Sequence, residues 1–136
     1  MPISGFDHVA LPTSRPEELI EFYGRLGFRV PGIEEWRSSA LPFFSVFFGD
    51  QKINFHAPSM WQDPDFEFRA PSSAPGCGDL CFAWEGGSAS LEKLLEAAAV
   101  SIIAGPVQLQ GARGKGTSVY IRDPEGNLLE FIIYDG

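Results

Sequence analysis

The sequence predicts an α+β fold, built from two βαβββ modules whose curved mixed sheets form a shared cleft. The chain has 136 residues, of which 44% are hydrophobic, enough for a packed core. Strand and helix patterns occur twice in the same order, and residues 45–48 with Asp50 resemble residues 118–121 with Asp123. Such a repeat indicates duplication, and each half alone is too small to bury its sheet well. We therefore expect the two sheets to curve toward each other around a cleft.

The first module is predicted to span residues 3–57. Alternating apolar residues predict its first strand over residues 6–11. Ser14 and Glu17 have the spacing of a capping box with Ser14 as N-cap, which predicts a helix that ends at Gly27. A strand region over residues 28–36, strands over 43–48 and 52–56, and a turn at 49–51 complete the module.

The second module, residues 77–136, repeats this order. A strand over residues 78–84 is followed by a glycine-rich break, with Ser88 or Ser90 as candidate N-cap of the next helix. One face of that helix is formed by Leu91, Leu94, Leu95 and Ala98. Strands are predicted over residues 106–110, 117–122 and 128–134, with a strong turn sequence at 123–127 before the last of them.

Residues 58–76 form a proline-rich linker between the modules, with no clear element. A segment of this length is unusual in a compact domain. One interpretation is a crossover strap, with Trp61, Phe66 and Phe68 packed on the surface. The other is a lid over the cleft or a dimer contact. We favour the crossover strap over the lid or dimer contact.

Composition excludes several function classes. The net charge of −8 argues against nucleic acid and against anionic membrane surfaces, because both require a basic face. The longest apolar runs have the length of strands, which is too short to cross a membrane. The first residues lack a basic region followed by an apolar stretch, so we expect no signal peptide and a cytoplasmic protein. Cys77 immediately precedes the predicted strand over residues 78–84, and Cys81 lies within it. Four residues of extended chain span ~13 Å, which is too far for a disulfide, so ordinary thiols are favoured over a redox pair.

Strand alternation places the polar residues on particular faces. His8 lies opposite Val9 and Leu11, Asn54 shares a face with His56, and Asp79 shares a face with both cysteines. Glu130 lies opposite its apolar neighbours Leu129 and Phe131. One face of each sheet must pack on a helix, so we expect the faces of these five polar residues to line the cleft.

A metal ion would satisfy these polar groups in an otherwise apolar cleft. His8 and His56 are the only histidines of the chain, and buried polar groups need partners. With Glu130 they form a two-histidine, one-carboxylate set that suits one divalent ion: Fe, Mn, Ni, Co or Zn. The alternative is structural, with both imidazoles hydrogen-bonded to the backbone or to Glu130.

Two further segments bear on the substrate. Residues 111–116 carry glycines and two cations, and either close over an anionic substrate through Arg113 or form an exposed hairpin loop. Of Tyr120 and Arg122, we expect at most one to face the cleft.

Two motifs resemble the vicinal-oxygen-chelate family, which includes glyoxalases, bleomycin-resistance proteins and dioxygenases. Residues 6–11 (FDHVAL), Phe22-Tyr23 and residues 26–28 resemble the opening of these proteins, and residues 123–131 (DPEGNLLEF) resemble their closing motif. The similarity covers nearly the whole chain. The branch most similar is the glyoxalase-domain-containing-5-like group, through residues 52–56, 66–68, Ala70, Pro75-Gly76 and 79–82.

The resemblance implies that a substrate with two neighbouring oxygens chelates the metal. His8 and Glu130 match ligand positions, and His56 is taken as the third ligand. Asp79 is taken as a fourth ligand, a partner of a ligand or a general base, so Glu130 and Asp79 are the candidate catalytic residues. Asn54 stands where glyoxalase I-like members have a carboxylate, and Asp79 where many members have a second histidine. These departures argue against standard glyoxalase I, extradiol dioxygenase and fosfomycin-transferase sites.

Two functions follow as expectations. The first is a metal-dependent lyase, isomerase or dioxygenase that acts on a small oxygenated molecule, with Asn54, Tyr120 and Arg113 as substrate contacts. The second is a protein that sequesters a drug or metabolite without metal chemistry, which the acidic charge and the aromatic linker suit. Family members usually dimerise, so we expect a homodimer.

Overall fold

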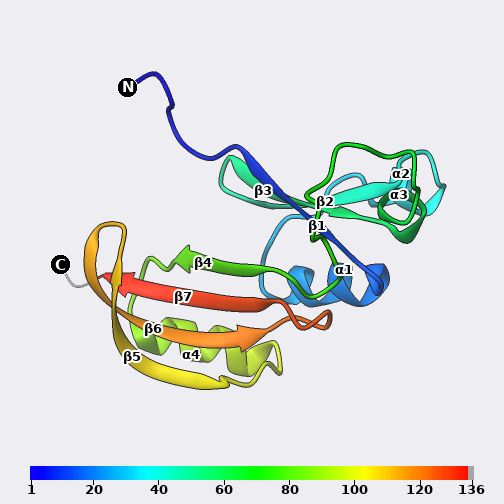
Figure 1. Ribbon diagram of the computed structural model, residues 1–136. Helices are drawn as coiled ribbons and strands as arrows, with labels where there is room; N and C mark the ends of the chain where they lie inside the picture. Colours follow the sequence, from blue (N-terminus) through cyan, green and yellow to red (C-terminus); the bar gives the residue numbers. More distant parts are fainter. Residues whose placement is uncertain (135–136) are drawn as a thin grey trace. The chain divides into compact units, whose positions relative to one another are not determined.

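The computed structural model describes residues 1–134, in two compact units (Figure 1). The first unit is Met1–Cys77 and the second begins at Gly78, so the predicted linker 58–76 belongs to the first. Each unit contains one mixed sheet, of three strands in the first and four in the second, with few helices. The predicted α+β class with two mixed sheets is confirmed. None of the helices over residues 1–134 is both long and apolar enough to span a bilayer.

The sheet of the first unit has the strand order β1-β3-β2. Strands β1 and β3 are parallel, whereas β2 and β3 form an antiparallel hairpin. The elements of this unit are β1 (His8–Pro12), α1 (Pro16–Arg25), α2 (Ile33–Arg37), β2 (Phe43–Phe48), β3 (Gln51–His56) and α3 (Pro58–Trp61).

The sheet of the second unit has the order β4-β7-β6-β5. Its first pair is parallel and the other pairs are antiparallel, so β4, β7 and β6 correspond to β1, β3 and β2. The elements are β4 (Asp79–Ala83), α4 (Ser88–Ala97), β5 (Ala104–Gly111), β6 (Gly114–Arg122) and β7 (Leu128–Tyr134). The predicted βαβββ order is therefore confirmed in this unit.

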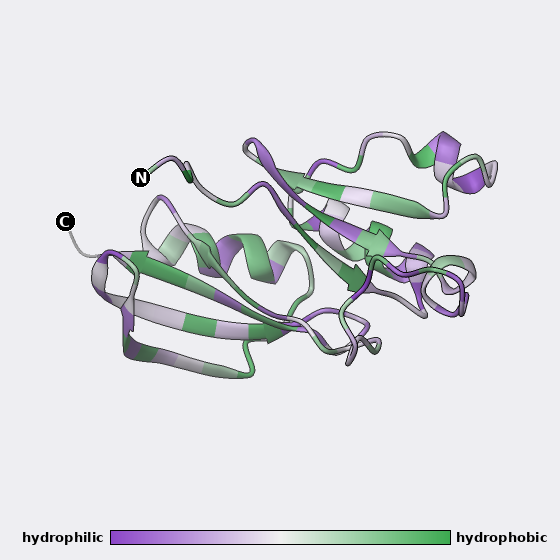
Figure 2. Ribbon diagram, turned by 45° about the horizontal axis from the view of Figure 1, so that its top comes forward, coloured by the Kyte–Doolittle hydropathy of each residue, from purple (hydrophilic) through white to green (hydrophobic). Residues whose placement is uncertain are grey.

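One face of each sheet forms an apolar core with a helix. In the first unit, Tyr23 of α1 is fully buried and its ring lies 5.5 Å from that of Phe55 in β3. In the second, Leu91 and Leu95 of α4 are buried, as the predicted helix face requires. The strands are mainly hydrophobic and are interrupted by hydrophilic residues (Figure 2). In β3 the buried Ile53 and Phe55 alternate with Asn54 and His56, because successive side chains of a strand point to opposite faces.

The predicted strand over residues 28–36 is wrong. Only Arg29 pairs, in an isolated bridge to Phe47 with N···O distances of 3.1 and 2.7 Å. Pro31 has no N–H to donate, and Gly32, with φ of 75°, turns the chain into helix α2. The bridge lies beside β2, the place that β5 occupies beside β6, so the first unit keeps one residue pair of its expected fourth strand.

The helix starts also differ from prediction. Helix α1 begins at Pro16 with Arg15 as N-cap residue, not with Ser14, and Glu17 bonds to Trp36 and Arg37 instead of completing a capping box. Proline suits the first helical position because a backbone N–H at that position would have no acceptor within the helix. The N-cap of α4 is Gly87, which precedes both candidate serines. The predicted stop after α1 is confirmed, since Gly27 has φ of 91°.

The linker is tied to the first unit. It contains the short helix α3, and the Trp61 indole N–H donates to the Thr13 carbonyl at 2.9 Å. Trp61 and Phe66 are half-buried, as a packed strap requires, but Phe68 is 85% exposed. The strap description therefore fits two of the three aromatic residues.

Candidate functional site

The sheet face of the first unit that is opposite α1 carries the predicted polar residues. In the register, Ala10 pairs with Asn54 and Asn54 with Ser45, so these residues form one row across the three strands. Asn54 accepts a hydrogen bond of 2.7 Å from the Ser45 hydroxyl. The opposite face contains the buried Ile53 and Phe55. The face predicted for Asn54 is thus the polar one.

His8 lies at the start of β1 with its ring oriented by a carboxylate. The His8 Nδ1 atom lies 2.6 Å from the Asp7 Oδ1 atom, and the two side chains are 45% and 89% exposed. A carboxylate acceptor at Nδ1 favours the tautomer in which Nδ1 carries the proton and Nε2 has the lone pair. Histidine ligands of metals are commonly oriented in this way.

His56 lies at the other end of the same face, between aromatic rings. Its ring is 6.4 Å from Phe43 and 5.6 Å from Phe66, both edge-on. Burial, and then the charge of His8, lower the pKa of His56, so its neutral form is favoured. In the register His56 pairs with Pro12 and His8 with Lys52, a separation of four residues, or ~13 Å along the strands. Asn54 lies between the two histidines on this face.

The corresponding face of the second unit is centred on Glu130. Cys81 of β4 and Tyr120 of β6 pair with Glu130 from its two sides. The Ser118 hydroxyl donates a hydrogen bond of 2.6 Å to the Glu130 Oε2 atom. Ser118 is fully buried and Glu130 half-buried, so the carboxylate is fixed to the sheet by a neighbour inside the unit.

The electrostatics of this row are dominated by burial and by Glu130. Burial, followed by the negative charge of Glu130, raises the pKa of the Cys81 thiol to about 12. The same two causes, in the same order, raise the pKa of Tyr120. Both groups therefore stay protonated at neutral pH, and both are donors beside the carboxylate.

Asp79 and Arg122 occupy the next row of this face. Both pair with Leu128, and Asp79 is exposed. Tyr120 and Arg122 lie two residues apart and therefore share this face. The expectation that at most one of the two lies on it is wrong. The Arg122 guanidinium donates to the Gly126 carbonyl at 3.0 Å.

Arg113 lies in a tight hairpin. Strand β5 ends at Gly111 and β6 begins at Gly114, so only Ala112 and Arg113 form the loop. The Arg113 guanidinium lies 4.4 Å from the centre of the Tyr134 ring, and its backbone N–H donates to the Tyr134 hydroxyl at 3.3 Å. Of the two interpretations of this segment, the exposed hairpin loop describes it, and its length leaves little chain to form a lid.

The predicted ligands lie in different units. His8 and His56 belong to the first unit and Glu130 to the second. Within residues 1–134, no group of three or more His, Cys, Asp and Glu side chains is close enough to hold a metal ion. The ligand set of His8, His56 and Glu130, the role of Asp79, and the substrate contacts Asn54, Tyr120 and Arg113 therefore stay predictions.

Sequence reasoning missed the partners of these residues. Ser45, Ser118 and Asp7 bond directly to Asn54, Glu130 and His8. Strand alternation would have placed both serines on the polar faces, and Asp7 is adjacent to His8 in sequence. The missing signal was the pairing register, which decides which side chains meet across strands.

Comparisons with known proteins agree with this fold. The Glyoxalase/Bleomycin resistance protein/Dioxygenase superfamily model matches residues 5–131. Virulence protein STM3117 of Salmonella typhimurium is 37% identical over 135 residues, covering 98% of this chain and 87% of that protein. Its crystal structure superposes with a TM-score of 0.83 at 36% identity, covering 99% of this chain and 100% of that chain. The glyoxalase domain-containing protein RDO1 of Mycosarcoma maydis is 33% identical over 134 residues, covering 98% of this chain and 70% of that protein.

Two more distant structures share the fold alone. Lactoylglutathione lyase from Agrobacterium tumefaciens is 23% identical with a TM-score of 0.68, covering 98% of this chain and 96% of that chain. TnmS3, an antibiotic binding protein from Streptomyces sp. CB03234, is 21% identical with a TM-score of 0.66, covering 99% of each chain. From residue 5 to residue 131, this chain belongs to the glyoxalase/bleomycin resistance/dioxygenase superfamily, the vicinal-oxygen-chelate proteins.

Proposed function

We propose that this protein is a metal-dependent enzyme that binds a small oxygenated substrate through two neighbouring oxygens on one divalent ion. The observation that carries the proposal is the pair of oriented donors. His8 has a carboxylate at Nδ1, and Glu130 is held by the buried Ser118 hydroxyl. Ligands with such outer partners are typical of metal sites, and imidazole with carboxylate suits Fe, Mn, Ni, Co or Zn.

Within this proposal His8 and Glu130 are ligands, and His56 is the third. A bound divalent ion would act as a Lewis acid and a template for the substrate oxygens. In the strand register His56 lies ~13 Å from His8. Asn54 lies between them on the same face and is therefore the alternative third ligand. Asp79 is a candidate general base because its carboxylate is exposed in the row next to Glu130. Asn54, Tyr120 and Arg113 are candidate substrate contacts.

The second candidate function is sequestration of a small molecule without metal chemistry. One observation favours it: Phe43 and Phe66 flank His56, and the exposed Phe68 lies 6.2 Å from Phe66. Exposed aromatic rings are suited to binding an apolar ligand. The fold itself does not decide between the two functions.

Metal titration distinguishes these candidates. Untagged protein, purified without chelators, is titrated with Fe(II), Mn(II), Ni(II), Co(II) and Zn(II), and the bound metal is measured by elemental analysis. We expect about one equivalent per chain, with occupancy lost in His8→Ala and Glu130→Ala but kept in the exposed control Glu92→Ala. Occupancy that survives both substitutions would mean that the site is wrongly assigned, and no specific binding of any metal would favour sequestration.

His56→Ala and Asn54→Ala decide the third ligand in the same titration. Loss of occupancy in His56→Ala alone supports His56, and loss in Asn54→Ala alone assigns the position to Asn54. We also propose a homodimer, which light scattering of the same samples measures. A monomer at all concentrations would contradict it.

A further inference from the structure

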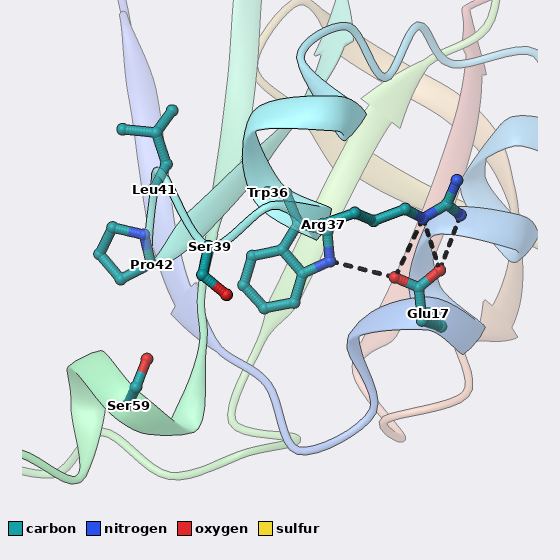
Figure 3. Close-up of a pocket in the computed structure, with 7 residues that line it drawn as sticks. All are labelled: Glu17, Trp36, Arg37, Ser39, Leu41, Pro42 and Ser59. Atoms are coloured by element: carbon teal, nitrogen blue, oxygen red, sulfur yellow. Dashed lines mark hydrogen bonds and ion pairs between the residues drawn. The ribbon is translucent and has the colours of Figure 1, made fainter.

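A pocket of the first unit is lined by residues that lie outside the strands of its sheet. Its volume is about 580 Å³. Figure 3 shows its lining residues, which are Glu17, Trp36, Arg37, Ser39, Leu41, Pro42 and Ser59. They come from α1, α2, α3 and the segment between α2 and β2, and none belongs to a strand or to the proposed metal site. Ligand pockets of proteins have volumes of roughly 300–1,000 Å³ and combine apolar walls with a few polar groups.

Trp36 forms a rigid wall of this pocket. Its indole N–H donates to the Glu17 Oε2 atom at 3.1 Å, and its ring lies 5.6 Å from that of Phe44. The ring is thus held at its polar edge and by an aromatic neighbour. A fixed aromatic surface binds a ligand without losing side-chain freedom on binding.

The polar end of the pocket is an internally neutralised ion pair. The Arg37 Nη2 and Nε atoms donate to the Glu17 Oε1 atom at 2.7 and 3.1 Å (Figure 3). This two-pronged geometry satisfies both charges. An anionic ligand would have to displace Glu17 from Arg37, and a cationic ligand would have to displace Arg37 from Glu17. The pocket therefore favours an uncharged ligand.

Ser39 occupies a position where glycine would be more stable. It follows α2 with φ of 62°, and the hydrogen bonds Ser39 N–H to Trp36 O (3.0 Å) and Ala40 N–H to Glu35 O (2.9 Å) form a Schellman motif. Glycine adopts this conformation without strain, whereas serine does not. What serine adds is a hydroxyl. In Figure 3 the Ser39 hydroxyl points toward the Trp36 ring, and the Ser59 hydroxyl points toward the segment that carries Ser39 and Pro42. Neither hydroxyl forms a hydrogen bond with another of the described residues.

We propose that this pocket binds a small uncharged aromatic molecule with a hydroxyl at its edge, of the phenol class. The ring would lie against Trp36, with Leu41 and Pro42 as further apolar contacts, and the phenol hydroxyl would bond to the Ser39 hydroxyl. A sugar fits less well, because its ring of hydroxyls would place polar groups against Leu41 and Pro42 without partners. This site is independent of the proposed metal site.

The test is an NMR titration of the full chain with phenol at millimolar concentrations. We expect a saturable shift of the Trp36 indole N–H signal, while the indole signals of Trp61 and Trp84 stay in place. Ser39→Gly should raise the Tm, because it relieves the strain, and weaken phenol binding about fivefold, because one hydrogen bond is lost. Ser39→Ala should weaken binding equally without the rise in Tm.

Three results would overturn the proposal. The first is the absence of a saturable Trp36 shift in the folded wild-type protein. The second is unchanged phenol affinity in both Ser39 variants, since the serine hydroxyl would then have no role. The third is tighter binding of methyl glucoside than of phenol, which would assign the pocket to a saccharide.

Discussion

The Ser118 hydroxyl donates a hydrogen bond of 2.6 Å to the Glu130 carboxylate, and the corresponding pair in the first unit is Ser45 and Asn54 at 2.7 Å. The pairs are not equivalent in register. Ser45 lies directly opposite Asn54, whereas Ser118 lies opposite Ile132 and reaches Glu130 across the diagonal. The difference of two residues keeps both serines on the polar face, because side chains alternate with a period of two. The two sheets thus carry corresponding polar pairs although their pairing registers differ.

Ser118→Ala should weaken metal binding, if Glu130 is a ligand, about 10- to 100-fold, because the carboxylate loses the hydroxyl that orients it. The measurement is isothermal titration of the proposed metal into wild type and variant, with circular dichroism to verify folding. Ser38→Ala is the control, since it removes a hydroxyl that bonds to the Glu35 carbonyl and belongs to neither polar row. Equal affinities of wild type and Ser118→Ala would contradict a role for this hydrogen bond.

Asn127→Ala should destabilise the protein by about 2–4 kcal/mol. The fully buried Asn127 side chain donates to Asp123 Oδ2 at 2.9 Å and accepts from the Gly78 N–H at 2.8 Å. Its removal leaves two buried polar groups without these partners. Urea denaturation measures the effect, with Asp50→Ala in the exposed hairpin loop of the first unit as control, expected within about 0.5 kcal/mol of wild type. A loss below about 1 kcal/mol in Asn127→Ala would show that water replaces both bonds.

Gly24→Ala and Gly116→Ala should have opposite effects. Gly24 lies in α1, and a methyl group added there would meet open space, so alanine should stabilise the helix by about 0.5–1 kcal/mol. A Cβ at Gly116 would lie 2.6 Å from Ile132 Cγ1 and 2.9 Å from the Ile133 carbonyl oxygen, so alanine should cost about 1–3 kcal/mol. Both free energies of unfolding come from chemical denaturation. A neutral or stabilising effect of Gly116→Ala would contradict the packing described for Gly116, and a loss of stability in Gly24→Ala would contradict the open space at Gly24.

Arg37→Gln should lower the Tm slightly at neutral pH, and the difference should disappear in acid. Hydrogen bonding to Arg37 is the largest cause that lowers the pKa of Glu17 from its ordinary value of 4.5. Because the folded-state pKa is the lower one, the contribution is present above pH 4.5 and is lost as the pH falls through the folded-state value. The effect should be small, since the pair is exposed and screened by solvent. Thermal melts between pH 3 and 7 measure it, and a difference that grows in acid would have the wrong sign.

Local sequence patterns determined most of the elements and their faces. The predicted strands over residues 43–48 and 128–134 coincide with β2 and β7, and the apolar face of α4 is buried. His8, Asn54, His56, Asp79 and Glu130 lie on the faces that alternation predicts. These features depend on the period of a single strand or helix, which is present in a short stretch of chain.

The tertiary structure decided the register and the exceptions to the local patterns. Pairing of β1 with β3 separates His8 from His56 by four positions, and pairing of β6 with β7 places Tyr120 beside Glu130. Glu17 leaves its predicted capping role because Arg37, twenty residues away in sequence, offers a stronger partner. Such neighbours are set by turn lengths and by contacts between distant segments, and no local period encodes them. The sequence by itself therefore determined which residues share a face, and only the tertiary structure decided which of them meet.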